Sequence, residues 1–142
     1  MQPNGVVELG FSNFQPWRVR MGGILYPTLE HAYQAAKTTE RSFQMDIAAC
    51  MSPGQAKRMG QSIPLRPDWE QYKIVIMDRL LRRKFKKGGK WADRLARTTG
   101  DLVEYNTWHD IFWGVCYCRT HAFEGENMLG QILTRIRDID NA

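Results

Sequence analysis

One carboxylate, that of Glu30, stands at a place in the sequence that suits chemistry better than packing. It lies in the stretch Tyr26–Lys37, where Pro27 disfavours a continuing strand and Thr28 can accept a backbone N–H as an N-cap, so a helix is predicted to begin at Thr28. Glu30 then falls in the first turn, where unpaired N–H groups and the positive end of the helix dipole favour the ionised carboxylate. Such an anion could stabilise a developing positive charge or take a proton from water, but it would be a poor general acid.

The predicted helix has two faces. Its polar positions fall together at helical spacing: Glu30, Tyr33, Gln34 and Lys37. Leu29, Ala32 and Ala36 form a small apolar stripe, so the pattern predicts one packed face and one polar face. From periodicity alone, the commoner explanation of Glu30 is an ordinary first-turn acid on a solvated face.

Length and composition favour one globular domain over residues 1–142 with a substantial core, since the chain has 142 residues of which 43% are hydrophobic. No apolar run approaches the roughly 20 residues of a membrane-spanning helix, and the N-terminus lacks a signal-peptide pattern. Three cysteines are too few for a disulfide scaffold, so we expect a soluble, cytoplasmic protein. The net charge of +5 favours anionic partners such as phosphate, nucleotide or nucleic acid.

The chain reads as an α+β protein, mainly helical with a small antiparallel sheet. A β-hairpin is predicted across Gly22-Gly23, between Trp17–Met21 and Ile24–Tyr26. Helices are then predicted at residues 42–50, 53–60, 69–85 and 91–97, the second of them with Ser52 as N-cap. A strand is predicted at residues 101–105, and Asn127 is the predicted N-cap of a terminal helix. Gly130 inside that last helix suggests that another segment packs closely against it.

The longest predicted helix carries a core stripe through Trp69, Tyr72, Ile76 and Leu80, widened by Ile74 and Val75. Trp69 stands at its N-terminal edge, where the ring could fill a core or stack on a base, and Lys73 follows one turn later. The helix ends in the basic run Arg82–Lys90, which is explained by a solvated helix C-terminus or by direct contact with DNA or RNA phosphates.

Polar and aromatic residues are concentrated in the segment after the predicted strand. Asp110 and Trp113 lie here, in a stretch of weak periodicity, and binding residues are disproportionately found on such loops. Asn13 lies in a turn-like Ser-Asn-Phe, where its amide could cap the backbone or face a ligand.

A metal site was weighed for Cys116, Cys118, His121 and His109. The Cys-x-Cys spacing is shorter than that of usual zinc sites, and on a strand it is explained by two small buried side chains. The sequence therefore predicts no metal and no cofactor, and no glycine-rich phosphate motif supports nucleotide hydrolysis or hydride transfer. A Cys/His nucleophile pair has no local signature in its favour.

Several motifs in the same order as in the YbiA-like or NADAR family give the chain a resemblance to that family. They are Phe11–Pro16, Tyr26–Lys37, Ser52–Gly60, Leu65–Trp69, Lys84-Phe85, Leu102–Glu104, Asp110–Gly114 and Gly125–Gly130. The resemblance extends over residues 11–137 and implies a YbiA-like fold and a metal-independent hydrolase, an N-glycosidase that acts on ribosylated bases or amines.

The resemblance also implies roles for individual residues. Glu30 matches a catalytic position, and Trp69, Asp110 and Trp113 match the rest of the family's active site. On this basis Glu30 and Asp110 are candidate catalytic residues, and the candidate substrate-binding residues are Asn13, Lys37, Trp69, Lys73, Trp113 and Asn127. One departure is Val115–Cys118, which stands where some members carry an acidic, glycine-rich loop, and it bears on substrate choice.

Two substrates follow from the resemblance: guanine carrying ADP-ribose, in nucleic acid or nucleotide, and a phosphoribosylamino-pyrimidine intermediate of riboflavin synthesis. The basic run Arg82–Lys90 favours the first. A rival of another class is a non-catalytic module that binds ADP-ribose or nucleic acid. Glu30 distinguishes them, because a glycosidase requires an anion that a binder of a diphosphate does not.

Overall fold

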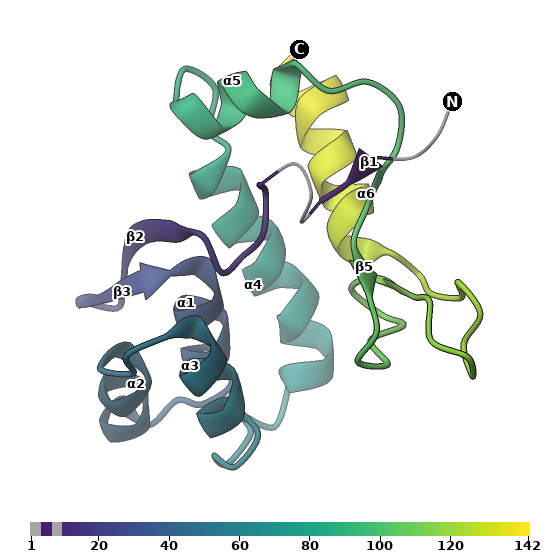
Figure 1. Cartoon of the computed structure of the whole chain (residues 1–142). Helices are drawn as coiled ribbons and strands as arrows, with labels where there is room; N and C mark the ends of the chain where they lie inside the picture. Colours follow the sequence, from purple (N-terminus) through teal and green to yellow (C-terminus); the bar gives the residue numbers. More distant parts are fainter. Residues whose placement is uncertain (1–3, 7–9) are drawn as a thin grey trace. The chain divides into compact units, whose positions relative to one another are not determined.

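The computed structural model describes residues 4–6 and 10–142, which form two compact units (Figure 1). The central unit is Asn13–Lys84. The terminal unit joins the described residues before Asn13 to Phe85–Ala142. In the described part of the chain, no helix combines the length and apolarity that crossing a membrane requires.

The central unit is a β-hairpin followed by four helices. Its elements are β2 (Pro16–Met21), β3 (Ile24–Thr28), α1 (Leu29–Ala35), α2 (Arg41–Ala48), α3 (Pro53–Gly60) and α4 (Trp69–Lys84). The strands are antiparallel, and Gly22 and Gly23 connect them with φ angles of 57° and 80°, as a primed two-residue turn requires. The predicted hairpin is confirmed.

Helix starts in the central unit follow their local sequence signals. The Thr28 hydroxyl accepts a hydrogen bond from the backbone N–H of His31 at 3.1 Å, and the Ser52 hydroxyl accepts one from Gln55 at 3.1 Å. Pro53 occupies the first helical position of α3, where its missing N–H leaves no bond unmade. Both predicted caps are confirmed.

The α1 helix lies inside the central unit and packs against β2, β3, α2, α3 and α4. All seven of its residues are buried. The alternative of a solvated face for Glu30 is therefore excluded, because neighbouring elements cover this short helix. Polar side chains on α1 must find their partners inside the protein.

The core stripe of α4 is placed differently from the prediction. Trp69, Ile76 and Leu80 are buried as expected. Ile74 and Val75 are 37% and 42% exposed, and the stripe widens instead through Met77 and Leu81. Val75 and Met77 lie on opposite sides of the stripe, and periodicity alone does not choose between them.

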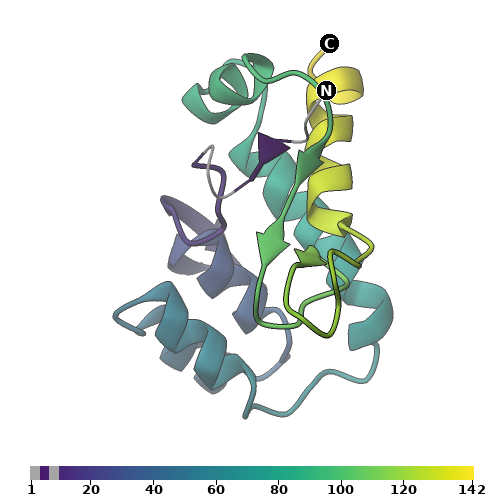
Figure 2. The same ribbon diagram turned by 45° about the vertical axis from the view of Figure 1, so that its right-hand side comes forward.

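The terminal unit contains short strands and three helical segments. They are β1 (Asn4–Gly5), α5 (Lys90–Ala96), β4 (Leu102–Val103), β5 (Tyr105–Asn106), β6 (Val115–Cys116), α6 (Met128–Arg135) and the π-helical η1 (Ile136–Asp140). β1 pairs in parallel with β4, beside which it lies in Figure 2, and β5 pairs in parallel with β6. The α+β, mainly helical class is confirmed, with β2 and β3 as the small antiparallel sheet; the parallel pairs were not predicted.

Asn127 precedes α6, but its side chain makes no capping bond. Its amide oxygen accepts from the Glu104 N–H at 2.9 Å and its amide nitrogen donates to the Leu102 carbonyl at 2.9 Å. The predicted side-chain cap is therefore wrong, because Asn127 ties α6 to β4 instead. The close packing predicted at Gly130 is confirmed, since a Cβ there would collide with the Leu102 carbonyl.

His31 is held as a neutral ring inside the central unit. Its Nε2 lies 3.1 Å from the Cys50 carbonyl, an obligate acceptor, so Nε2 carries the proton and Nδ1 accepts from the Thr28 hydroxyl at 2.7 Å. The side chain is 1% exposed, and this burial lowers the pKa of His31 below 6.5, although the bond to Cys50 opposes the shift.

We expect His31 to make unfolding easier below about pH 6.5. The unfolded histidine binds a proton at its ordinary pKa, and the folded one does so only at lower pH, so stability falls as the pH drops through this window, with a slope of at most about 1.4 kcal/mol per pH unit. Urea unfolding of wild type and His31→Gln across this range gives two slopes of the free energy of unfolding against pH, and their difference is the His31 contribution. Equal slopes would contradict a lowered pKa of His31.

Candidate active site

The Glu30 carboxylate is enclosed by the central unit. Glu30 is 7% exposed, its backbone N–H donates to the Asn13 carbonyl at 3.2 Å, and its Oε1 accepts from the Gln34 amide nitrogen at 2.8 Å. These contacts exclude the alternative of an ordinary first-turn acid on a solvated face. A carboxylate in such a place is a candidate for chemistry, because burying its charge requires compensating interactions.

Asn13 is placed directly beside the start of α1 by its backbone bond to Glu30. Its amide nitrogen donates to the Met77 sulfur at 3.7 Å, which is a weak acceptor. Its amide oxygen is buried and has no hydrogen-bond partner among the residues that the structure describes. The oxygen is thus a buried acceptor that the described residues leave unpaired, and substrate binding by Asn13 stays a prediction.

Gln34 was not among the predicted site residues. It is 3% exposed and follows Glu30 by one helical turn, so its amide fixes one oxygen of the carboxylate. Its own amide oxygen is buried without a partner in the described part of the chain. The signal that could have identified it is the i, i+4 spacing of a carboxylate and an amide on one short helix.

Lys37 brings a positive charge to the same region. Its partial burial lowers the pKa of Lys37, the Glu30 carboxylate acts in the opposite direction, and Lys57 adds to the lowering. The interaction with Glu30 ties Lys37 to the carboxylate two helical turns earlier. A cation here compensates the buried anion and is also suited to a phosphate contact.

Trp69 packs within the central unit. Its ring lies 5.3 Å from that of Tyr33 on α1 and 6.5 Å from that of Tyr72, and the residue is 7% exposed. This arrangement brings Trp69 to the helix that carries Glu30, while most of its surface serves packing. Lys73 forms an ion pair with Glu70 at 2.9 Å.

Asp110 organises the loop of the terminal unit that bears Trp113. Its Oδ1 accepts from the backbone N–H groups of Phe112 at 3.0 Å and Trp113 at 2.9 Å. The Asn106 side chain accepts from the Asp110 backbone N–H and donates to the Asp110 carbonyl. The Phe112 and Trp113 rings meet edge to face at 4.8 Å. One carboxylate oxygen of Asp110 is therefore engaged in holding the turn.

The predicted site residues fall into two sets. Asn13, Glu30, Lys37, Trp69 and Lys73 belong to the central unit, and Asp110, Trp113 and Asn127 belong to the terminal unit. Within the first set, direct interactions link Glu30 to Asn13 and to Lys37. In the second, Asp110 and Trp113 share one turn, and Asn127 bonds to β4 and its following residue.

Comparison with known proteins gives consistent matches. The NADAR domain model matches residues 4–139. N-glycosidase YbiA of Escherichia coli strain K12 is 37% identical over 131 residues, covering 90% of this chain and 79% of that protein. The NMR structure of E. coli YbiA has a TM-score of 0.73 at 35% identity, covering 90% of this chain and 75% of that one. The chloroplastic riboflavin biosynthesis protein PYRR of Zea mays is 33% identical over 144 residues, covering 89% of this chain and 22% of that protein.

We expect Gly60→Ala to destabilise the protein by about 1–3 kcal/mol, because its new Cβ would collide with the Gln34 side chain that holds Glu30. Gly54→Ala is the matched control on the same helix, since a Cβ there meets its nearest atom at 3.6 Å. Urea unfolding of both variants measures the difference. Equal stability of the two would contradict the close packing of Gln34 on α3.

Proposed function

Because the chain belongs to the NADAR domain family, we propose that it is a hydrolase that cleaves the bond between ribose and nitrogen in an N-glycosyl compound. The family match spans nearly the whole chain, and a relative of similar length is named an N-glycosidase. The observation that carries the proposal is the buried Glu30 carboxylate, which is held on one oxygen by Gln34.

In the proposed reaction, the C1′–N bond breaks and its electron pair leaves with the nitrogen, which takes up a proton. The oxygen of a water molecule forms the new bond to C1′ and loses a proton. The sugar passes through an oxocarbenium-like state, so an anion beside C1′ stabilises the transition state more than the substrate. Glu30 supplies that anion or accepts the proton from water, and Lys37 compensates its charge at rest.

A non-catalytic binder of ADP-ribose explains Glu30 less well. A diphosphate ligand carries negative charge, and a buried carboxylate close to it would weaken binding unless the anion had another task. Stabilising a cationic sugar is such a task. The buried position of Glu30 therefore favours the enzyme over the binding module.

The remaining predicted residues take supporting roles. Asp110 orients water or a ribose hydroxyl, and Trp69 and Trp113 stack on or border the base. Asn13 offers its buried amide oxygen to the ribose or the base. Lys37, Lys73 and Asn127 contact phosphate or ribose groups.

For the substrate, we propose guanine carrying ADP-ribose, which makes the enzyme one that reverses ADP-ribosylation of nucleic acid or nucleotide. The exposed lysines Lys86, Lys87 and Lys90 support an anionic, extended substrate. Lys84 is not part of that exposed surface, because it is 3% exposed, and this burial lowers its pKa to about 8. The second candidate is a phosphoribosylamino-pyrimidine, which the riboflavin-related name of the maize relative supports.

Glu30→Gln should lower the rate of base or amine release by about 100-fold to 10,000-fold, because it removes the charge and keeps the shape and the contact with Gln34. Release is followed by chromatography with ADP-ribosylated guanosine and with a phosphoribosylamino-pyrimidine. The matched control is Glu40→Gln, at an exposed acid that makes no capping bond. Cleavage of neither compound by wild type would exclude both substrates, and an unimpaired Glu30→Gln variant would exclude the catalytic role.

Neutralising Lys86, Lys87 and Lys90 to Gln should weaken binding to DNA or RNA and reduce the slope of log affinity against log salt by up to about 2–3. Fluorescence anisotropy at several salt concentrations measures both quantities. The control replaces the exposed Arg79, Arg119 and Arg135, which changes the net charge equally at scattered positions. Equal slopes for the two triple variants would remove the nucleic-acid contact at this run.

A further inference from the structure

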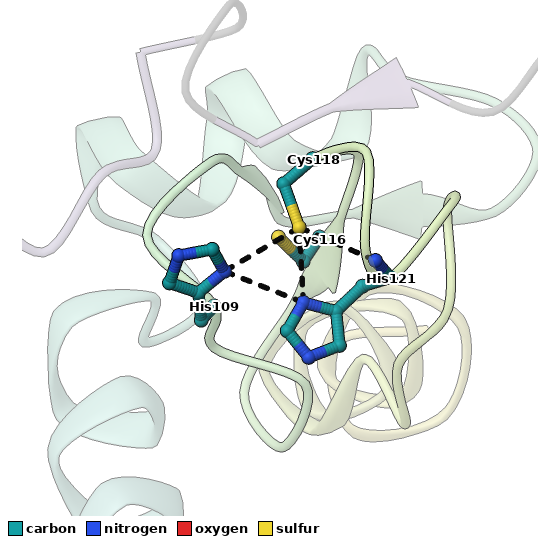
Figure 3. Close-up of side chains that lie close together, drawn as sticks. All are labelled: His109, Cys116, Cys118 and His121. Atoms are coloured by element: carbon teal, nitrogen blue, oxygen red, sulfur yellow. Dashed lines mark hydrogen bonds between the residues drawn. The ribbon is translucent and has the colours of Figure 1, made fainter.

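Four metal-ligating side chains converge in the terminal unit, outside the residues assigned to the hydrolase reaction. They are His109, Cys116, Cys118 and His121, and one ligand atom from each lies within 4.8 Å of all the others (Figure 3). Among the residues that the structure describes, this is the one group of at least three such side chains. We propose that this cluster, the His109–His121 cluster, is a structural zinc site.

The spacing of the ligand atoms fits tetrahedral zinc. With Zn–S and Zn–N bonds of about 2.3 and 2.0–2.1 Å, the ligand atoms of a tetrahedron lie about 3.3–3.8 Å apart. The two histidine Nδ1 atoms are 3.4 Å apart and the Cys118 sulfur lies 3.4 Å from Nδ1 of His109, both within this range. The Cys118 sulfur lies 3.0 Å from Nδ1 of His121, which is slightly shorter than the range. Two sulfurs and two imidazole nitrogens form the Cys2His2 set that zinc takes in closed sites.

The backbone around the cluster holds the ligands in place. The hairpin that carries Cys116, Cys118 and His121 closes by antiparallel bonds between Cys116 and its other side. The Cys116 N–H donates to the Glu124 carbonyl at 2.9 Å, and the Phe123 N–H donates to the Cys116 carbonyl at 2.8 Å. The His121 N–H also donates to the Cys118 sulfur at 3.3 Å, as expected for a hydrogen bond that supports a ligating thiolate.

Three residues at the cluster adopt left-handed backbone conformations that side chains other than glycine rarely take. His109 has φ 72°, and Ala122 and Phe123, which follow His121, have φ 46° and 67°. Such conformations persist only where surrounding interactions fix them. Residues 107–114 and 117–123 contain no helix or strand, so turn and hairpin hydrogen bonds fix these conformations, and the proposed metal would add to that constraint.

Zinc would therefore act as a cross-link rather than as a reagent. Four protein ligands leave no open position for water or substrate, which is the property of structural sites. The ion would join the loop after β5, which carries His109, to the hairpin that begins at β6. In that loop His109 immediately precedes Asp110. This proposal does not depend on the hydrolase activity.

The test begins with the full wild-type chain expressed with zinc. We expect one zinc per chain by elemental analysis after desalting, and X-ray absorption that shows two sulfur and two nitrogen ligands. Cobalt replacement should produce the absorption bands of tetrahedral, thiolate-bound cobalt. Substoichiometric zinc with no cobalt bands would overturn the site, and a spectrum with an oxygen ligand would overturn its closed, structural character.

Variants locate the metal. Cys118→Ser and His121→Ala should each lower zinc affinity by more than about 100-fold, measured by chelator competition. Cys50→Ser is the matched control, since Cys50 is the remaining cysteine and belongs to the central unit. Equal affinity of Cys118→Ser and Cys50→Ser would overturn the assignment.

Metal removal gives a readout that does not require any variant to fold. Chelation of wild type should lower the melting temperature and speed amide hydrogen exchange in residues 107–124 more than in α1. Restoring zinc should reverse both changes. Unchanged exchange in residues 107–124 upon loss of bound zinc would overturn the cross-linking role.

Discussion

The burial of one negative charge at the start of α1 is the constraint on which the central unit depends. A carboxylate that is 7% exposed needs a hydrogen bond and a nearby cation. Gln34 on α1 supplies the bond, and Lys37, two residues after α1 ends, supplies the cation. The Asn13 carbonyl accepts the Glu30 N–H, which joins the start of the hairpin to the helix. The packing around α1 therefore serves to hold a charge that a purely structural helix would not retain at this position.

The buried polar atoms on and beside α1 differ in whether they have hydrogen-bond partners. Thr28 and His31 form a closed set with the Cys50 carbonyl, in which every buried polar atom has a partner. By contrast, the amide oxygens of Asn13 and Gln34, both beside Glu30, have none in the described part of the chain. Unpaired buried acceptors lower stability unless a ligand meets them, and both of these belong to residues that bond to Glu30.

Local signals predicted the parts of the fold that local physics decides. Thr28 and Ser52 cap their helices, and Gly22-Gly23 turns the hairpin. The burial of α1 was missed because it depends on elements distant in sequence, and Asn127 was misassigned as a side-chain cap because its amide bonds to the distant β4. The Glu30 position was recognised from its turn and the family motif, whereas Gln34 required the side-chain geometry.

The metal ligands show why spacing along the chain is a weaker guide than spacing in space. The Cys-x-Cys spacing is shorter than that of usual zinc sites, and two small buried side chains on a strand would explain it, which argued against a metal. The strand β6 ends at Cys116, however, and the chain turns before His121, so both thiols approach the same point. A helix such as α1 orients its side chains through regular hydrogen bonds, but the segment around Asp110 and Trp113 has no such ladder. Asp110 and Asn106 hold that turn by side-chain hydrogen bonds, and the proposed zinc site would add a cross-link from His109 to the hairpin that carries the other three ligands.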